Sequence, residues 1–388
     1  MSRLRVTLLR AELWTLIGSA IALSLLGIYA IDVASGGKSV GLSPLAMKQG
    51  VYLGVGILLA AASAIPSYRR LGPIVWLLYA AAVGLLLFLL IPAVPHSIVR
   101  PRNGARCWID LGPFNFQPGE FAKIAFIVAV AHHLRYRDSY RRVLGFIPPA
   151  AITAVPMLLI LLQPDLGMAS LFVPTLFAML IAAGAKLKHV ALIVALGLAS
   201  APAAYPFLLP HQKGRIDALI KQAQGDYSGK ESSQYQQIKA ITLAGAGGVA
   251  GLGDRHSRVV LDFNDLPEAH NDMIFSVVVN RFGLLGGLAV IGLMLTWIGS
   301  AVVIAGRTKD PFGRLIAVGL AAMLAVQAAV NIGMCLGVAP IVGITLPFIS
   351  AGGTSMLASL AATGLLANIA IRPPQRLARQ SFEFGQSD

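Results

Sequence analysis

Residues 72–93, GPIVWLLYAAAVGLLLFLLIPA, form an apolar run that contains no charged side chain. A helix needs about 20 mostly apolar residues to cross the hydrocarbon core of a bilayer, so this run predicts a transmembrane helix. The whole chain shares this character, because 56% of its 388 residues are hydrophobic and 12% are charged. An ordinary soluble domain carries about 25% charged residues. The composition therefore excludes a soluble globular enzyme, a disordered protein and a disulfide scaffold, and it predicts an all-α polytopic membrane protein.

Similar apolar runs recur along the chain and predict about ten transmembrane helices. We place them at residues 12–33, 49–66, 72–93, 120–134, 146–163, 166–184, 187–209, 275–305, 314–336 and 353–371. The run at 120–134 is short and begins with polar residues, and the run at 275–305 is longer than one span. Two long loops interrupt the pattern, at about 94–119 and, between spans 7 and 8, at about 210–274. We expect a single membrane domain over residues 1–388.

The distribution of basic residues predicts the orientation of these spans. The chain has 31 basic and 17 acidic residues, and more than half of the basic ones fall in the alternate short loops and the two tails. They are Arg3, Arg5, Arg10, Arg69, Arg70, Arg135, Arg137, Arg141, Arg142, Lys186, Lys188, Arg307, Lys309, Arg314, Arg372, Arg376 and Arg379. Loops rich in Lys and Arg stay cytoplasmic, so we expect both termini inside and the two long loops outside. No small-residue cleavage site follows the first span, which we therefore expect to be retained as an anchor.

The first long loop carries basic and aromatic residues on the side where the orientation rule does not require them. Arg106 and Trp108 lie in this loop, and an anionic ligand at the outer leaflet would explain the basic residue. Trp108 is either an interfacial anchor or a platform for a sugar or a lipid headgroup. Glu120 and Lys123 follow at a spacing that places them on one helix face, where they form either a structural ion pair or part of a site.

Three weaker patterns have simple structural explanations. In QPDLG at 163–167, Asp165 is best explained as the cap of the helix that follows. The glycines at 245–250 match a dinucleotide-binding pattern but lack a preceding strand, so close packing or a turn explains them. Cys107 and Cys335 are too few for a disulfide framework or a cysteine-rich metal site.

The stretch LPEAHNDMIF at 266–275 holds two carboxylates and an imidazole just before an apolar span. If it is helical, Glu268 and Asp272 share a face, and Asp272 at the boundary of water and membrane is a candidate general base. A solvated loop with a helix cap is the alternative. Further on, Asn331 lies inside a span, and PFISAGGTS at 347–355, which includes Ser350, is broken by glycine and proline. Broken segments in membranes line cavities or are buried in protein, so we expect a re-entrant loop that reaches a polar site.

Four of these blocks together resemble the SEDS family, the group of RodA, FtsW and SpoVE. They are GARCWIDLG with QPGEFAK at 104–123, QPDLG at 163–167, Tyr235 and Gln236 through PEAHNDMIF ending at 275, and the stretch from Asn331 to Gly353. The resemblance covers nearly the whole chain, and a RodA-like protein fits best. It implies a peptidoglycan glycosyltransferase that transfers the lipid-linked glycan to the GlcNAc 4-hydroxyl of lipid II and releases undecaprenyl pyrophosphate. Its partner would be a class B penicillin-binding protein with transpeptidase activity, in the bacterial inner membrane.

The resemblance also implies roles for individual residues around one extracytoplasmic cavity. Asp272 matches the essential aspartate of the family, a general base or a positioner of the acceptor hydroxyl. Family positions around the same cavity are Arg106, Trp108, Glu120, Lys123, Asp165, Arg215, Glu268 and His270, and Ser350 lies in the fourth block. The charge of the pyrophosphate requires nearby Arg and Lys or a divalent cation, Mg²⁺ or Mn²⁺. The net charge of +14 is thereby divided between orientation and pyrophosphate, with no part for nucleic acid.

The chain departs from the family pattern at several positions. Gly119, Asn271 and Ala351 stand where Ser, Thr and Tyr are usual, and Asn280 and Arg281 replace a pair of glutamates. No family block matches residues 217–234. Two other functions stay open: a lipid II flippase, and a non-catalytic scaffold for a penicillin-binding protein. Short termini favour a RodA-like role in elongation and cell shape over an FtsW-like role in division.

Overall fold

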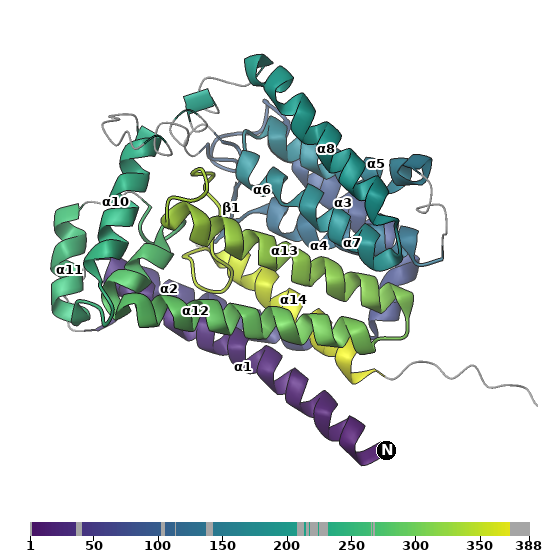
Figure 1. Cartoon of the computed structure of the whole chain (residues 1–388), viewed down its shortest axis with the longest axis horizontal. Coiled ribbons are helices and arrows are strands. Elements are labelled where there is room, and N and C mark those ends of the chain that lie inside the picture. Colours follow the sequence, from purple (N-terminus) through teal and green to yellow (C-terminus); the bar gives the residue numbers. More distant parts are fainter. Residues whose placement is uncertain are drawn as a thin grey trace, which may run out of the picture.

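The computed structural model is a bundle of long helices with a smaller helical region at one end (Figure 1). It describes residues 2–35, 41–101, 105–112, 114–136, 143–207, 213–214, 217, 224, 232–264, 266 and 268–372. The helices are α1 (Ser2–Ala34), α2 (Pro44–Ala64), α3 (Leu71–Leu90), α4 (Pro118–Leu134), α5 (Ile147–Leu162), α6 (Leu166–Ser170), α7 (Phe172–Ala183), α8 (Leu187–Ala204), α10 (Ser232–Ala246), α11 (Gly253–Asn264), α12 (Ile274–Arg307), α13 (Pro311–Cys335) and α14 (Gly353–Ile371). Short 3₁₀ turns lie at Tyr68–Arg70, Val143–Phe146 and Tyr205–Phe207. A two-residue antiparallel hairpin, β1 (Ile109–Asp110) with β2 (Asn115–Phe116), lies in the first long loop.

The prediction of an all-α polytopic membrane protein is confirmed. Eight helices in the described residues are long and apolar enough to cross a membrane. Two of the ten predicted spans fall short of this measure, since α4 has 17 residues and α8 contributes a shorter apolar segment, Leu187–Gly197. The predicted span at 166–184 consists of α6 and α7 in sequence. The predicted basic residues Arg137, Arg141, Arg142, Arg376 and Arg379 lie outside the described residues.

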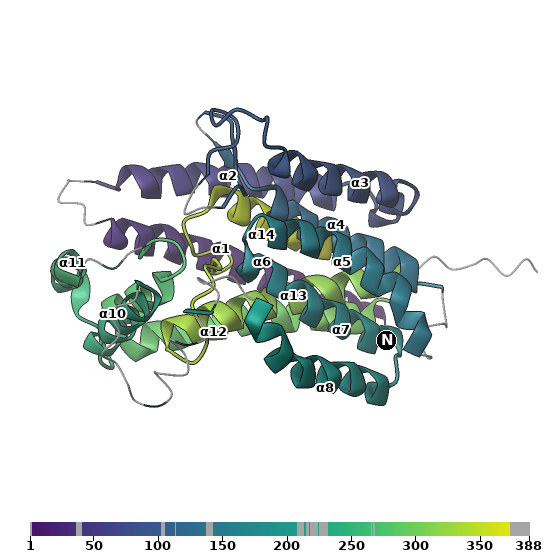
Figure 2. The same ribbon diagram turned by 90° about the horizontal axis from the view of Figure 1, so that it is seen from above.

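Helix α4 lies inside the bundle, which explains how so short a helix can belong to it. It packs against α3, α5, α7, α13 and α14, and nearly all of its residues are buried (Figure 2). A span in contact with lipid must match the thickness of the hydrocarbon, whereas a helix enclosed by protein need not. Among the pairs of helices that do not include α4, the most extensive contacts join α2 with α14, α1 with α12, and α12 with α13.

Helix α12 is interrupted where the glycine-rich segment 245–251 meets it. Gly283 adopts φ 69° and ψ −167° inside the helix, a conformation that favours glycine. A Cβ there would lie 2.2 Å from the Val249 carbonyl oxygen, and one on Gly251 would lie 2.3 Å from the Arg281 carbonyl oxygen. The Leu284 amide donates to the Gly248 carbonyl at 2.9 Å. The prediction that close packing or a turn explains the glycines at 245–250 is confirmed for two of them, because a Cβ on Gly247 would lie 2.1 Å from the Val279 carbonyl oxygen and Gly248 has φ +53° in a turn.

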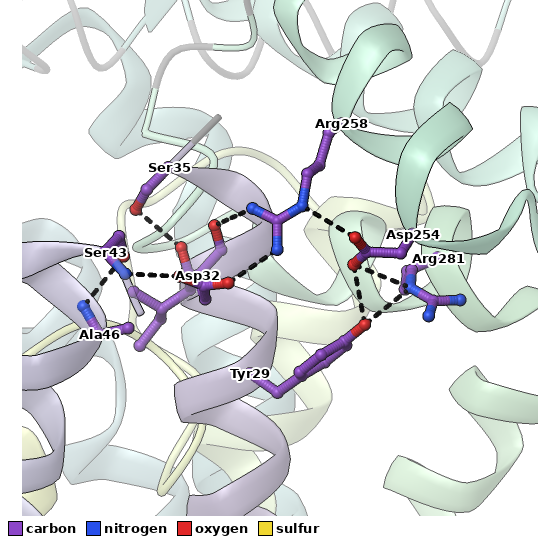
Figure 3. A network of polar contacts seen from close by, with 9 residues as sticks. Tyr29, Asp32, Ser35, Ser43, Ala46, Asp254, Arg258 and Arg281 are labelled. Carbon is purple, nitrogen blue, oxygen red and sulfur yellow. Dashed lines mark hydrogen bonds and ion pairs between the residues drawn. The ribbon is translucent and has the colours of Figure 1, made fainter. Parts of the chain in front are cut away.

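Helices α10 and α11 pack on the first part of α12, and a network of charged groups ties α11 to the bundle (Figure 3). Arg258 on α11 pairs through Nη2 with Asp32 Oδ2 of α1 at 2.7 Å and through Nε with Asp254 Oδ2 at 3.2 Å. The Tyr29 hydroxyl donates to Asp254 Oδ1 at 2.9 Å, and Arg281 Nε donates to the Tyr29 hydroxyl at 3.0 Å. The hydrogen bonds from Arg258 and Tyr29 hold the pKa of Asp254 below its usual value.

Candidate functional site

The main cavity lies at the end of the bundle near α10 and has a volume of about 720 Å³. Its wall comes from the first turns of α2 and α4, the hairpin loop at 105–117, α6 with the residues beside it at 164–171, and residues 268–272. The non-helical stretch between α13 and α14 contributes residues 342–345, 351 and 352, and the first turn of α14 contributes residues 353–355. The prediction that this glycine- and proline-broken stretch reaches a polar cavity is confirmed.

Asp272 lies in a segment that the neighbouring stretch and α13 hold firmly. Asn331 Nδ2 on α13 donates to the Asp272 carbonyl at 2.9 Å and to the Ile344 carbonyl at 2.6 Å. The Ser350 hydroxyl donates to the Asn271 carbonyl at 2.6 Å. A Cβ on Gly343 would lie 3.5 Å from Asp272 Oδ2, so the carboxylate faces a glycine whose φ is +70°. Backbone contacts thus fix the place of the candidate base while its carboxylate lines the cavity.

Glu268 and His270 line the same wall as Asp272, although the segment is not helical. Residues 268–273 form consecutive turns, and α12 begins only at Ile274. Glu268 has φ +55°, a left-handed conformation that is uncommon for residues other than glycine. The Asn271 side-chain amide donates to Glu268 Oε2. The helical interpretation of this stretch was wrong, yet the expected meeting of both carboxylates at one cavity holds.

The lining of the cavity also contains a buried ion pair at the start of α4. Lys123 Nζ lies 2.9 Å from Glu120 Oε2, and each side chain is 5% exposed. The same ammonium donates to Gln327 Oε1 of α13 at 2.9 Å, and Gln327 Nε2 donates to the Thr345 carbonyl at 2.9 Å. All three of these charged and amide side chains line the cavity. The pair is therefore an ion pair and a part of the cavity wall at once.

The turn at 163–167 supplies Asp165, which caps α6 as predicted. The Met168 amide donates to Asp165 Oδ1 at 2.9 Å, and Asp165 also lines the cavity. Trp108 lines the cavity from the hairpin loop. The Cys107 thiol next to it is buried and donates to the Gln163 carbonyl at 3.4 Å. Burial, with a smaller effect of the Asp165 charge, raises the pKa of the Cys107 thiol.

Of the predicted site residues that the structure describes, two do not line the cavity. Arg106 donates from Nη2 to the Val94 carbonyl at 3.3 Å and does not belong to the lining. Ser350 is buried behind the wall, where its hydroxyl also accepts from the Leu346 amide at 2.7 Å, so it supports the loop. Arg215 and most of residues 217–234 lie outside the described residues.

One whole face of the cavity was not predicted from the sequence. Lys48, Gln49 and Tyr52 on the first turns of α2 line it, and Gln49 Nε2 donates to the Ser350 carbonyl at 3.1 Å. Lys48 and Gln49 lie four and three residues before Tyr52, and this spacing on one helix face was the available signal. Gln327 on α13 offered no such signal, because a single amide inside an apolar span gives no periodic pattern.

The departures from the family pattern at Asn280 and Arg281 are structural contacts rather than cavity residues. Asn280 is fully buried, accepts from the Ser257 hydroxyl at 2.7 Å and donates to the Leu243 carbonyl at 2.8 Å. It therefore joins α10 and α11 to α12. Arg281 belongs to the charged network around Tyr29. Neither residue belongs to the lining of the cavity, so the charge reversal acts on how α11 is held.

The described lining of the cavity carries more acidic than basic groups. Lys48 and Lys123 are its basic side chains, against the carboxylates of Glu120, Asp165, Glu268 and Asp272. In the part of the chain that the structure describes, no group of three or more His, Cys, Asp or Glu side chains is arranged to hold a metal ion. The cavity therefore offers no ready-made metal site, and the Mg²⁺ or Mn²⁺ ion stays a prediction from the resemblance.

The fold and the cavity together define a class: a multi-pass helical membrane protein with a large polar cavity at one end of the bundle. The chain belongs to the FtsW/RodA/SpoVE family, whose model, described as "Cell cycle protein", matches residues 10–373. The resemblance to the SEDS family is thereby confirmed.

Relatives and solved structures agree with this assignment. The chain is 35% identical over 372 residues, 91% of each protein, to a probable peptidoglycan glycosyltransferase FtsW of Nitrosococcus halophilus. It is 34% identical over 286 residues, 73% of the chain and 76% of the relative, to stage V sporulation protein E of Bacillus subtilis. A chain from a solved peptidoglycan synthase complex matches with a TM-score of 0.77 and 32% identity, covering 92% of this chain and 97% of that one. The rod shape determining protein RodA of Thermus thermophilus matches with a TM-score of 0.66 and 30% identity, covering 92% and 96%. These relatives confirm the expected class, a peptidoglycan glycosyltransferase of cell-wall synthesis.

Proposed function

We propose that this protein polymerises peptidoglycan glycan strands by transferring a lipid-linked glycan to the GlcNAc 4-hydroxyl of lipid II. The acceptor oxygen attacks the donor sugar carbon, the bond from that carbon to the phosphate oxygen breaks, and undecaprenyl pyrophosphate leaves. The proton of the acceptor hydroxyl goes to Asp272. The observation that carries this proposal is that one cavity is lined by both Asp272 and Lys123.

The lining of the cavity suits the two charge changes of this reaction, the loss of a proton by the acceptor hydroxyl and the growth of negative charge on the leaving pyrophosphate. A carboxylate fixed by its backbone is well placed to accept a proton from a hydroxyl that enters the cavity. An ammonium held by Glu120 and Gln327 is positioned in advance to stabilise negative charge that develops on the leaving pyrophosphate. Lys48 on α2 adds a second cation to the wall. The ring of Trp108 offers a surface on which a sugar can stack.

The orientation and the partner follow from the same proposal. The cavity would face the extracytoplasmic side of the inner membrane, with both termini in the cytoplasm, as the loop charges indicate. The partner would be a class B penicillin-binding protein, since a structural neighbour belongs to a synthase complex that coordinates polymerization and crosslinking. Relatives named FtsW, SpoVE and RodA leave the elongation role as a prediction beside a division role.

A polymerisation assay tests the proposal directly. Purified protein with its transpeptidase partner receives fluorescent lipid II, and the products are separated on a gel. We expect glycan polymer from the native chain and none above background from Asp272→Asn. The matched control is Asp262→Asn, which makes the same chemical change at an exposed acid on α11 outside the cavity. It should polymerise at the native rate.

The alternatives give different results in the same experiment. Native-level polymer from a folded Asp272→Asn variant would refute the role of Asp272. Absence of polymer, combined with transport of lipid II across vesicle membranes, would establish the flippase instead. Absence of both, with the partner becoming active only when this chain is bound, would establish the scaffold.

A further inference from the structure

A second, smaller pocket lies at the end of the bundle opposite the main cavity. Its volume is about 190 Å³, and it lies between the C-terminal ends of α12 and α14, the loop that connects α12 to α13, and the 3₁₀ turn at Tyr68–Arg70. Helix α14 begins at the main cavity with Gly353 and ends at this pocket with Ile371. Its 19 residues separate the two by about 28 Å, at a rise of about 1.5 Å per residue.

Basic side chains from separate parts of the chain converge on this pocket. Arg69 comes from the 3₁₀ turn, Arg307 and Lys309 from the end of α12 and the following loop, and Arg372 from the end of α14. In the described lining the single carboxylate is that of Asp310. The orientation rule explains why loops on one side are basic. The orientation rule does not explain why basic groups that are far apart in the sequence line one pocket.

The carboxylate of Asp310 is already engaged. Its Oδ2 accepts from the Tyr68 hydroxyl at 2.7 Å, and its Oδ1 caps α13 by accepting from the Phe312 amide at 3.2 Å. The Arg69 guanidinium approaches Oδ2 only to 3.7 Å. The one carboxylate of the described lining therefore cannot balance the four basic groups.

The remaining basic groups differ in what they contact. Arg307 pairs with Glu12 of α1, while Arg372 donates to the neutral Asn368 Oδ1 at 2.7 Å and to the Ile65 carbonyl. Lys309 is exposed, and no carboxylate pairs with it in the part of the chain that the structure describes. The Arg372 guanidinium and the Lys309 ammonium therefore carry positive charge that no acidic group of the described structure offsets.

Apolar side chains continue from this charged pocket along the outside of the bundle. Ile371 belongs to its lining and is 55% exposed, and Val303, one turn before Arg307 on α12, is 39% exposed. Ile304 and Ile369 also line the pocket but are buried. A ligand that fits this surface has an anionic head and an apolar tail. Basic pockets between transmembrane helices bind the phosphate groups of anionic lipids, and a guanidinium suits a phosphate especially well.

We propose that this pocket binds the phosphate group of an anionic phospholipid, with the acyl chains lying along the end of α12 and α14. The site is independent of the glycosyltransfer reaction, because its residues lie at the other end of the bundle. Inorganic phosphate shares the chemistry of the head, and the apolar surface favours the lipid.

The test measures binding to the full-length protein in a neutral detergent. The probes are dioctanoyl phosphatidylglycerol, dioctanoyl phosphatidylcholine and inorganic phosphate, and the readout is the saturable rise in the thermal unfolding temperature. We compare the native chain, Lys309→Gln and the double variant Lys309→Gln/Arg372→Gln. The control is Lys186→Gln/Lys188→Gln, which removes two charges from the loop after α7 and the start of α8 at the same end, away from the pocket.

We expect saturable binding of phosphatidylglycerol that is about 5-fold weaker in Lys309→Gln and about 30-fold weaker in the double variant, with the control unchanged. Inorganic phosphate that binds as tightly, with the same sensitivity to the variants, would support the pocket and identify free phosphate as its ligand. Equal weakening in the control, equal binding by phosphatidylcholine, or no saturable binding would overturn the proposal. The single variant Lys309→Gln changes only an exposed side chain and should stay folded. Its binding therefore tests the proposal even where the double variant is unstable.

Discussion

The buried pair of Glu120 and Lys123 makes a quantitative prediction that separates stability from activity. The two charged atoms are 2.9 Å apart with each side chain 5% exposed, so their attraction is about 6 kcal/mol at an effective dielectric constant of about 20. Removal of both groups from water opposes most of this attraction. Loss of one partner leaves the other buried without a counter-charge, and that change costs about 3–5 kcal/mol.

We therefore expect Lys123→Met to lower the free energy of unfolding by about 3–5 kcal/mol, because a carboxylate stays behind in the wall. Glu120→Gln should cost less, about 1–2 kcal/mol, because Lys123 keeps its hydrogen bond to Gln327. The double variant Glu120→Gln/Lys123→Met should cost about 2–3 kcal/mol, less than the sum of the single variants. The expected coupling energy is about 2–3 kcal/mol.

The assay is equilibrium unfolding in mixed micelles with a rising fraction of sodium dodecyl sulfate, followed by tryptophan fluorescence. Lipid II polymerisation is measured on the same samples. We expect the double variant to fold and yet to lose polymerisation, because the cavity has lost the buried Lys123 ammonium and only Lys48 is left in its described lining. A coupling energy within about 0.5 kcal/mol of zero would refute the reasoning on stability. Native-rate polymerisation by the double variant would show that the pair is structural alone.

Three further predictions concern other parts of the molecule. Gly343→Ala should reduce polymerisation far more than its strain of about 1–2 kcal/mol reduces stability, because φ is +70° and the new methyl faces Asp272; equal losses in both assays would contradict this. The lowered pKa of Asp254 means that the network around Arg258 contributes stability above the ordinary pKa of the carboxyl and loses it as pH falls through the lowered value. Pepsin should accordingly cut α11 faster at pH 2.5 than at pH 4.5 relative to an unstructured peptide, and a constant ratio would argue against it. Cys107, with its raised pKa, should resist iodoacetamide at pH 8 until the protein unfolds, which mass spectrometry of the alkylated peptide can check.

Much of the fold follows from hydropathy, and the exceptions share a physical cause. Apolar runs predict the order and the approximate limits of the long helices because lipid imposes one length and one composition on them. The same signal cannot identify the face of α2 that carries Lys48 and Tyr52, since hydropathy averages over all faces of a helix. It also gives no sign of α10 and α11, which are polar helices inside a loop.

The candidate site was predicted in part for a related reason. Asp272, Lys123 and Asp165 lie in dense polar blocks next to apolar runs, and such blocks are conspicuous in the sequence. Ser350 shares a block with cavity residues, but its hydroxyl turns to the backbone behind the wall. The contact between Arg281 and Tyr29 joins residues 252 positions apart, and nothing local in the sequence indicates it.

The enclosed position of α4 has a consequence for how the protein is made. A helix that carries Glu120 and Lys123 in its first turns and has 17 residues is a poor substrate for insertion on its own, because charged residues raise the free energy of transfer into lipid. Helix α3 precedes it in the chain, is strongly apolar and is among its closest neighbours in the bundle. The two helices would then have to enter the bilayer as a hairpin, with α4 kept there by later helices rather than by lipid. Insertion of α4 would accordingly depend on α3, and its retention on the helices that enclose it, α5, α7, α13 and α14.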